Sequence, residues 1–148
     1  MEMTGAQLIP LPQAATWKAL NDPEVLKDCI PGCESITRLA ENEYEVALTA
    51  KVGPVSAKFK GKMTVTDSDP PNSYRLAFEG QGGVAGFAKG EATVKLNPQG
   101  NSTQLTYAAK ASVGGKLAQV GARLIDGVAK QLAGKFFEAF EKRAGGKP

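Results

Sequence analysis

The chain has 148 residues, of which 42% are hydrophobic and 22% charged, the composition of one ordinary globular domain. Its net charge of +3 comes from 18 basic and 15 acidic residues scattered along the whole length, without the concentrated basic stripe that nucleic-acid binding needs. No stretch approaches the roughly 18 apolar residues of a membrane-spanning helix, and the start of the sequence does not resemble a secretory signal, so we expect a cytoplasmic protein that does not bind nucleic acid.

The N-terminal part predicts one strand and two short helices. Residues 2–9 form a largely apolar segment that stops at a proline, as the first strand of a sheet would. Pro12 suits the first turn of a helix that ends near Asn21, because its missing N–H is harmless there. Asp22-Pro23 then begins a second short helix, and Pro31-Gly32 marks a turn.

From Tyr44 to Val113 the residues alternate between apolar and polar, which is typical of strands with one wet face. Turn signals divide this region into consecutive hairpins, so that about six or seven antiparallel strands are expected in all. Many inward positions are small, and either the following helix packs closely there or a cavity remains. These positions are Ala50, Ala57, Gly61, Gly80, Ala88, Gly90, Ala92, Ala109 and Ala111.

The C-terminal region predicts one long amphipathic helix. From Leu117 to Ala139 apolar residues recur every three or four positions, so a helix of roughly 26 residues would run nearly 40 Å. We place Gly121 on its apolar face, although a glycine inside a helix costs about 1 kcal/mol relative to alanine. We therefore interpret the helix as the movable wall of a binding site. The whole pattern is α+β, with one domain over residues 1–143 and a linker or tail beginning at 144–148.

The sequence contains no catalytic constellation. There is no histidine, which removes the commonest general base and metal ligand. Cys29 and Cys33 lack further Cys or His partners for a metal site, and we expect both to be reduced thiols. We therefore predict no catalytic residue, no metal and no cofactor. The basic row Lys58, Lys60 and Lys62 is either a solvated strand face or a docking surface for an acidic partner or lipid head groups.

The aromatic residues at inward positions allow two interpretations. Large inward aromatics usually form the core, yet ligand pockets are lined by the same residue types. From the residues alone both remain open. Tyr44, Tyr74 and Tyr107 are the candidates to hydrogen-bond a ligand carbonyl.

Two segments, Asp22-Pro23-Glu24-Val25-Leu26 and Cys29-Ile30-Pro31-Gly32-Cys33-Glu34, together with the order of elements, resemble the CoxG family of carbon monoxide dehydrogenase accessory proteins. This family lies within the START-like (SRPBCC) superfamily, and the similarity extends over nearly all of the chain. Gly53-Pro54-Val55, Phe59-Lys60-Gly61 and the run from Gly80 to Gly90 are also similar. The resemblance implies a helix-grip (START/Bet v 1-like) fold, in which a curved antiparallel sheet wraps around the C-terminal helix and leaves an apolar cavity.

The resemblance also implies a function. Members of the family are accessory proteins of molybdenum-containing carbon monoxide dehydrogenases, implicated in recruiting the enzyme to the cytoplasmic membrane and in handling quinone. We therefore expect a non-enzymatic monomer or homodimer that binds a quinone or another isoprenoid or lipid-like molecule, with peripheral contact to the inner face of that membrane. The cavity lining expected on this basis is Trp17, Leu26, Ile30, Phe59, Phe78, Phe87, Tyr107, Val120, Gly121, Leu124 and Val128.

Two rival functions stay open. START-like domains include cyclases and hydrolases that use cavity carboxylates and tyrosines, and an acidic residue inside the cavity would favour an enzyme. The other rival is an assembly or membrane-recruitment module whose core is filled.

Overall fold

The computed structural model describes residues 1–144, which fold into a seven-stranded antiparallel sheet with helices against it, and this confirms the expected α+β class. The expected tail at 144–148 lies outside the described residues except for Ala144, where the last helix ends. In chain order the elements are β1 (Glu2–Ile9), α1 (Gln13–Leu20), α2 (Pro23–Cys29), β2 (Cys33–Ala40), β3 (Glu43–Val52), β4 (Val55–Asp69), β5 (Ser73–Gln81), the short 3-10 helix η1 (Gly83–Ala85), β6 (Phe87–Gln99), β7 (Ser102–Gly114), α3 (Lys116–Gln119) and α4 (Ala122–Ala144).

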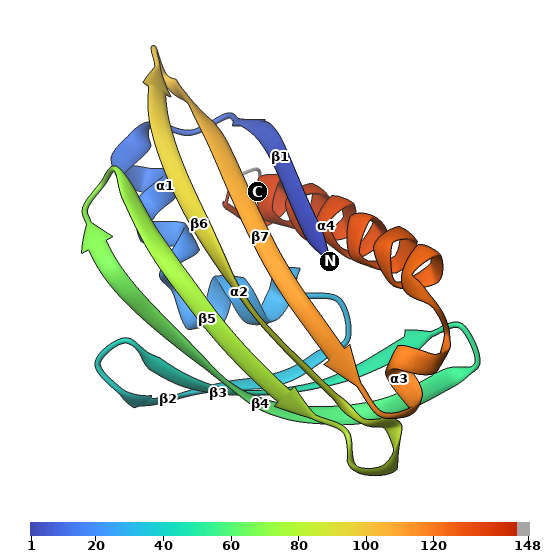
Figure 1. The fold of residues 1–148 in the computed structure, drawn as a ribbon. Coiled ribbons are helices and arrows are strands. Elements are labelled where there is room, and N and C mark those ends of the chain that lie inside the picture. The colour runs from blue at the N-terminus through green and yellow to red at the C-terminus, as the bar shows by residue number, and fades with distance from the viewer. Residues whose placement is uncertain (145–148) are drawn as a thin grey trace.

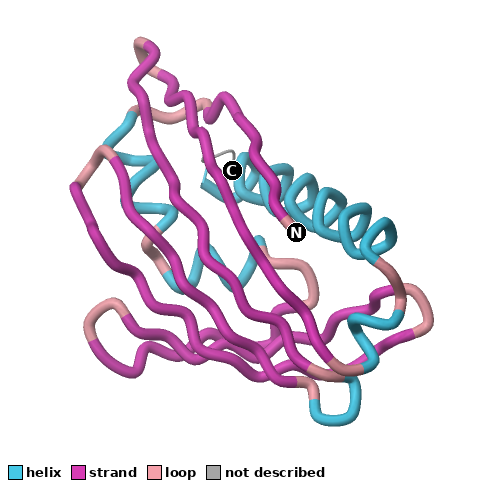
Figure 2. Tube along the Cα trace, in the orientation of Figure 1, coloured by secondary structure: helices cyan, strands magenta, loops and turns pink. Residues whose placement is uncertain are grey.

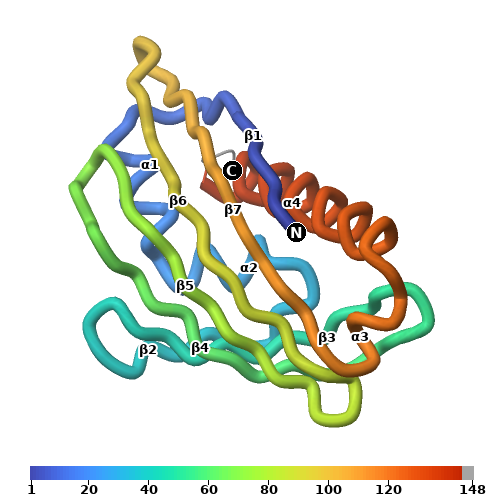
Figure 3. Tube along the Cα trace, in the orientation of Figure 1, coloured from blue at the N-terminus to red at the C-terminus, as the bar shows by residue number. Residues whose placement is uncertain are grey.

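The strands lie in the order β1-β7-β6-β5-β4-β3-β2. β1 and β2, which α1 and α2 separate in the sequence, therefore form opposite edges of the sheet. Figure 1 shows that the sheet bends strongly, so that β2, β3 and β4 pass beneath the ends of β5, β6 and β7. In Figure 2 the helices α1, α2 and α4 lie on one side of this bent sheet, and Figure 3 shows that they come from the two ends of the chain. This is the helix-grip arrangement that the resemblance implied.

The bend is sharp where two glycines face each other across β4 and β5. Gly61 pairs with Gly80, and a Cβ added to Gly61 would collide with the carbonyl oxygen of Glu79 and lie 2.8 Å from the Cα of Gly80. Only a residue without a side chain allows the two strands to approach so closely. The small inward residues noted in the sequence thus help to curve the sheet.

The core gathers at one end of the sheet, under α1 and the C-terminal half of α4. Ile9, Leu105 and Phe140 are at most 1% exposed there. A buried polar contact fixes α1 to β7, because the Thr103 hydroxyl donates to the carbonyl of Leu11 (2.7 Å) and the Thr16 hydroxyl meets it at 3.3 Å. This end of the molecule is well packed.

The long C-terminal helix differs from the prediction in one respect. The structure divides it into α3 and α4, with Val120 and Gly121 between them. Gly121 has φ +96°, outside the helical region, and its carbonyl accepts the first hydrogen bond of α4 from the N–H of Ile125 (3.1 Å). The placement of Gly121 on the apolar face of a continuous helix was therefore wrong. A spacing of three or four residues across one non-helical residue looks the same as an unbroken helix.

The strand β2 was not located from the sequence. It is an edge strand paired only with β3, and most of its residues are exposed, so the apolar alternation that revealed the other strands is absent. No helix within residues 1–144 is long and apolar enough to cross a membrane.

Candidate functional site

A cavity of about 360 Å³ lies between the inner face of the sheet and the helices α2 and α4. Its wall draws on β1 and β3 to β7, on α1, α2 and the residue that follows each of these helices, and on the C-terminal half of α4. This size is at the lower end of the range for small-molecule sites, about 300–1,000 Å³. The cavity therefore occupies the place in which the family's fold implies one.

The strand register orders the cavity wall into rows. Tyr74, Val94, Tyr107 and Gly5 lie side by side on four neighbouring strands at the end next to the core. Two rows further along the same inner face, Phe78 lies beside Gly90. Phe78 is a lining residue and is still 38% exposed, so it stands where the cavity opens.

Three tyrosines supply hydroxyl groups to an otherwise apolar wall. Tyr44 and Tyr74 are 6% and 4% exposed, and Tyr107 is half-buried. Tyr74 meets Trp17 edge to face with ring centroids 5.2 Å apart, and Tyr107 stacks on Phe137 at 5.7 Å. These contacts fix the orientation of both rings.

The tyrosine hydroxyls have no protein partner within residues 1–144. No fully buried side-chain oxygen or nitrogen of this part of the chain lacks a hydrogen bond, so each hydroxyl must keep some accessible surface. Burial raises the pKa of Tyr74 well above its usual value, because the phenolate would be poorly solvated there. At neutral pH the three groups are protonated and can donate to a ligand oxygen.

The wall carries no charge. None of the residues that line the cavity is an aspartate, glutamate, lysine or arginine. The remaining polar side chain is that of Asn21, whose amide nitrogen donates to the carbonyl of Trp17 (2.9 Å) and closes the end of α1. The carboxylate that would favour an enzyme is thus missing from the part of the wall that residues 1–144 form.

Of the predicted lining residues, four lie on the cavity wall: Leu26, Ile30, Phe78 and Tyr107. Leu26 comes from α2 and Ile30 directly follows it, while Phe78 and Tyr107 come from the sheet. Whether any of the four contacts a ligand remains a prediction.

The other seven predicted residues lie elsewhere. Trp17 supports Tyr74 from behind, Phe59 covers Gly82, and Val120 and Gly121 form the break before α4. Phe87 follows the outward phase of β6 with Lys89 and Glu91 and covers Gly114 of β7. Leu124 reaches the turn at Gly53, and Val128 is half-buried on α4.

The sequence missed part of α4. Ala133, Phe136 and Phe137 face the cavity, and Phe137 and Phe140 are the most buried side chains of the helix. The predicted stripe ran through Leu132, Phe136 and Ala139, one side of the face that the structure buries. The spacing of Phe137 and Phe140 was the available signal.

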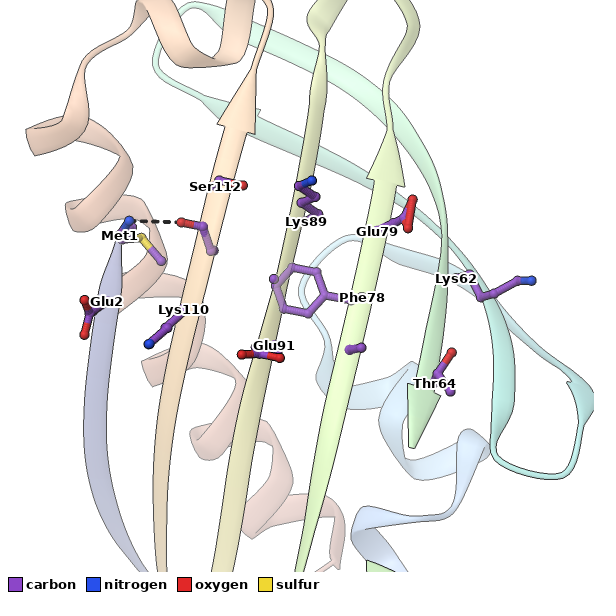
Figure 4. A pocket seen from close by; sticks show the side chains of 13 residues that line it. Met1, Glu2, Lys62, Thr64, Phe78, Glu79, Lys89, Glu91, Lys110 and Ser112 are labelled. Atoms are coloured by element: carbon purple, nitrogen blue, oxygen red, sulfur yellow. Dashed lines mark hydrogen bonds between the residues drawn. The ribbon is translucent and has the colours of Figure 1, made fainter. Parts of the chain in front are cut away.

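The outer face of the sheet is charged. A shallow hollow of about 560 Å³ lies there, and Figure 4 shows Glu2, Lys110, Glu91, Lys89 and Glu79 projecting around it from neighbouring strands. Because it is open, polar and of mixed charge, it does not have the character of a small-molecule site.

The basic row on β4 belongs to the same outer face. Each lysine lies near a glutamate of β2 or β3: Lys62 with Glu43 at 3.4 Å, and Lys58 and Lys60 with Glu34 and Glu45, both at 3.8 Å. All these side chains are at least 40% exposed, so each pair contributes little to stability. The pairing accounts for the row as a solvated ladder of ions.

The two thiols lie beside the cavity and not on its wall. Cys29 is buried at the end of α2, Cys33 is half-buried at the start of β2, and the two are not joined. Burial raises the pKa of both, which lowers their reactivity. No cluster of three or more potential metal ligands exists within residues 1–144.

The comparisons with known proteins agree with this geometry. The family model for CoxG, a subunit of carbon monoxide dehydrogenase, matches residues 5–145. The crystal structure of a conserved protein from Geobacillus kaustophilus is 36% identical, with a TM-score of 0.92 over 98% of this chain and 95% of that one. The chain has no match among curated proteins.

More distant structures share the fold alone. The ZhuI aromatase/cyclase from Streptomyces sp. R1128 is 13% identical, with a TM-score of 0.69 over 97% of this chain and 93% of that one. Ara h 8.0201 is 18% identical, with the same TM-score over 99% of both chains.

Proposed function

Because the chain belongs to the CoxG family of carbon monoxide dehydrogenase, we propose that it is a non-enzymatic accessory protein that binds an apolar small molecule, a quinone or related isoprenoid, in the cavity under α4. In this proposal the bound molecule serves a molybdenum-containing dehydrogenase of the carbon monoxide dehydrogenase type. It does so by carrying quinone to the enzyme or by helping to recruit the enzyme to the membrane.

The observation that carries the proposal is the uncharged cavity with its three tyrosine hydroxyls. Removing apolar surface from water contributes about 25 cal/mol for each Å², so an isoprenoid gains affinity from such a wall without ionic recognition. A few hydroxyls then suffice to orient the polar end of the ligand.

The first test concerns the ligand. Native mass spectrometry and lipid extraction of the protein purified from its own host should reveal a bound apolar molecule, and added quinone should raise the melting temperature. An empty cavity together with an unchanged melting temperature would overturn the ligand-binding function.

The second test concerns the partner. The dehydrogenase should be retained by the tagged protein, and the retention should depend on whether the cavity is loaded with quinone. If the protein holds quinone but does not retain the dehydrogenase, and the dehydrogenase does not reduce the bound quinone, the carrier role fails while ligand binding stands.

A cyclase or hydrolase is the less favoured alternative. The chain shares its fold with the ZhuI aromatase/cyclase, yet the wall formed by residues 1–144 offers tyrosines and no carboxylate or lysine for proton transfer. Turnover of a polyketide or ester probe that is lost in Tyr74→Phe would bring the enzyme back.

A further inference from the structure

The polar and apolar parts of the inner face are separated along the strands. Tyr74 and Tyr107 share one row beside the core, on either side of Val94. Four residues further along β5, about 13 Å at the usual rise of a strand, Phe78 marks the opening. The hydroxyls of Tyr74 and Tyr107 thus lie at the closed end and the apolar ring at the open one.

Beyond Phe78 the next row of the inner face has almost no side chains. Gly80 lies there beside Gly61 and Ala88, and all three are half-buried. A Cβ added to Gly80 would meet one atom, the carbonyl oxygen of Ala88 at 4.0 Å. In contrast to Gly61, then, Gly80 is not required by close strand packing, and what its missing side chain leaves is open space.

α4 does not close that space. Its C-terminal half buries Phe137 and Phe140, while Leu124 and Leu132 in its N-terminal half are 37% and 39% exposed. The helix packs mainly against α2 and has few contacts with β1 and β3. The inner face beyond Phe78 is therefore only partly covered.

We infer that the site takes an uncharged ligand in one orientation, with its oxygen-bearing end against Tyr74 and Tyr107 and its apolar tail leaving past Phe78 over Gly80. This inference rests on the proposed function and adds two properties to it. The first is selection against ionised ligands, because no cation lines the wall to compensate a buried carboxylate. The second is a tail length set by Gly80.

The charge selection is tested with two probes that share one tail. Geranylgeraniol and geranylgeranoic acid are titrated into the full chain, emptied of any ligand, at a pH where the acid is ionised. We expect the alcohol to bind at least about tenfold more tightly. Equal or tighter binding of the acid would overturn the selection.

The orientation is tested with Tyr74→Phe. Losing one hydrogen bond should weaken geraniol, farnesol and geranylgeraniol by a similar factor, about fivefold, because the three alcohols share their polar end. Tyr44→Phe and Tyr107→Phe report whether another hydroxyl takes the same role. Unchanged affinity in all three variants would contradict the orientation.

The tail path is tested with Gly80→Val, and Ala77→Val on the exposed outer face of the same strand is the matched control. Gly80→Val should weaken geranylgeraniol at least about tenfold and leave geraniol within about twofold, since a short tail ends before it reaches Gly80. Ala77→Val should change neither. Melting curves of both variants show whether they fold.

The possible failures are distinguishable. If none of the alcohols and no quinone binds the wild-type protein, the proposed function itself fails. If they bind and Gly80→Val weakens short and long alcohols equally, or neither, the tail path is wrong while the proposed function stands.

Discussion

The two ends of the contact between sheet and helices are built differently. At one end Phe140, Ile9 and Leu105 are fully buried, and the Thr16 and Thr103 hydroxyls join α1 to β7. At the other end the sheet offers Phe78 and Gly80, and Leu124 and Leu132 of α4 remain more than a third exposed. One end provides the stability of the fold and leaves the other free to be completed by a ligand.

The largest difference between the two ends should appear in alanine substitutions. Phe140→Ala should lower the free energy of unfolding by about 3–5 kcal/mol, because it leaves a cavity in the packed end. Leu132→Ala should change it by less than about 1 kcal/mol, because Leu132 is 39% exposed. Urea denaturation measures both. Similar losses in the two variants would remove the distinction between the ends.

A second difference should appear in the sign of glycine substitutions. Gly121 has φ +96°, so Gly121→Ala should destabilise the fold by about 1–3 kcal/mol. Gly134 lies inside α4 with nothing within 4 Å of an added Cβ, so Gly134→Ala should stabilise it by up to about 1 kcal/mol. Thermal unfolding of the two variants gives the signs. A stable Gly121→Ala variant would mean that α3 and α4 can join into one helix.

The smallest effect should come from alkaline pH at the packed end. The thiol of Cys29 has a pKa raised above its ordinary value of 9.0, so folding favours its protonated form. Its contribution to stability is therefore complete below about pH 9 and is lost as the pH rises through the folded-state pKa. Denaturation curves should show stability falling above that pH, and Cys29→Ala should fall less steeply over the first part of the range. Parallel curves for the two proteins would contradict this assignment.

Some parts of the fold could be predicted from the sequence and others could not, for physical reasons. Strands with one buried face show an apolar alternation, so β3 to β7 were found, whereas the exposed edge strand β2 was not. Small inward residues predicted either close packing or a cavity, and the structure has both, with close packing at Gly61 and open space at Gly80.

The cavity wall was harder to predict than the fold. Leu26, Ile30, Phe78 and Tyr107 were placed correctly on it, yet the face of α4 was set one step off, and Phe137 was missed. The phase of a helix restarts after a break, and the φ of Gly121 that causes the break cannot be read from apolar spacing. Phe87 was chosen because it is aromatic, although its own strand alternation directs it outward.

The central claim is that the open end of α4 is completed by a ligand and the packed end is not. Amide hydrogen exchange of α4, with and without bound geranylgeraniol, tests it most directly. We expect the ligand to slow exchange in residues 122–132 and to leave residues 137–144 unchanged. Equal protection of both halves, or protection of the C-terminal half alone, would contradict it.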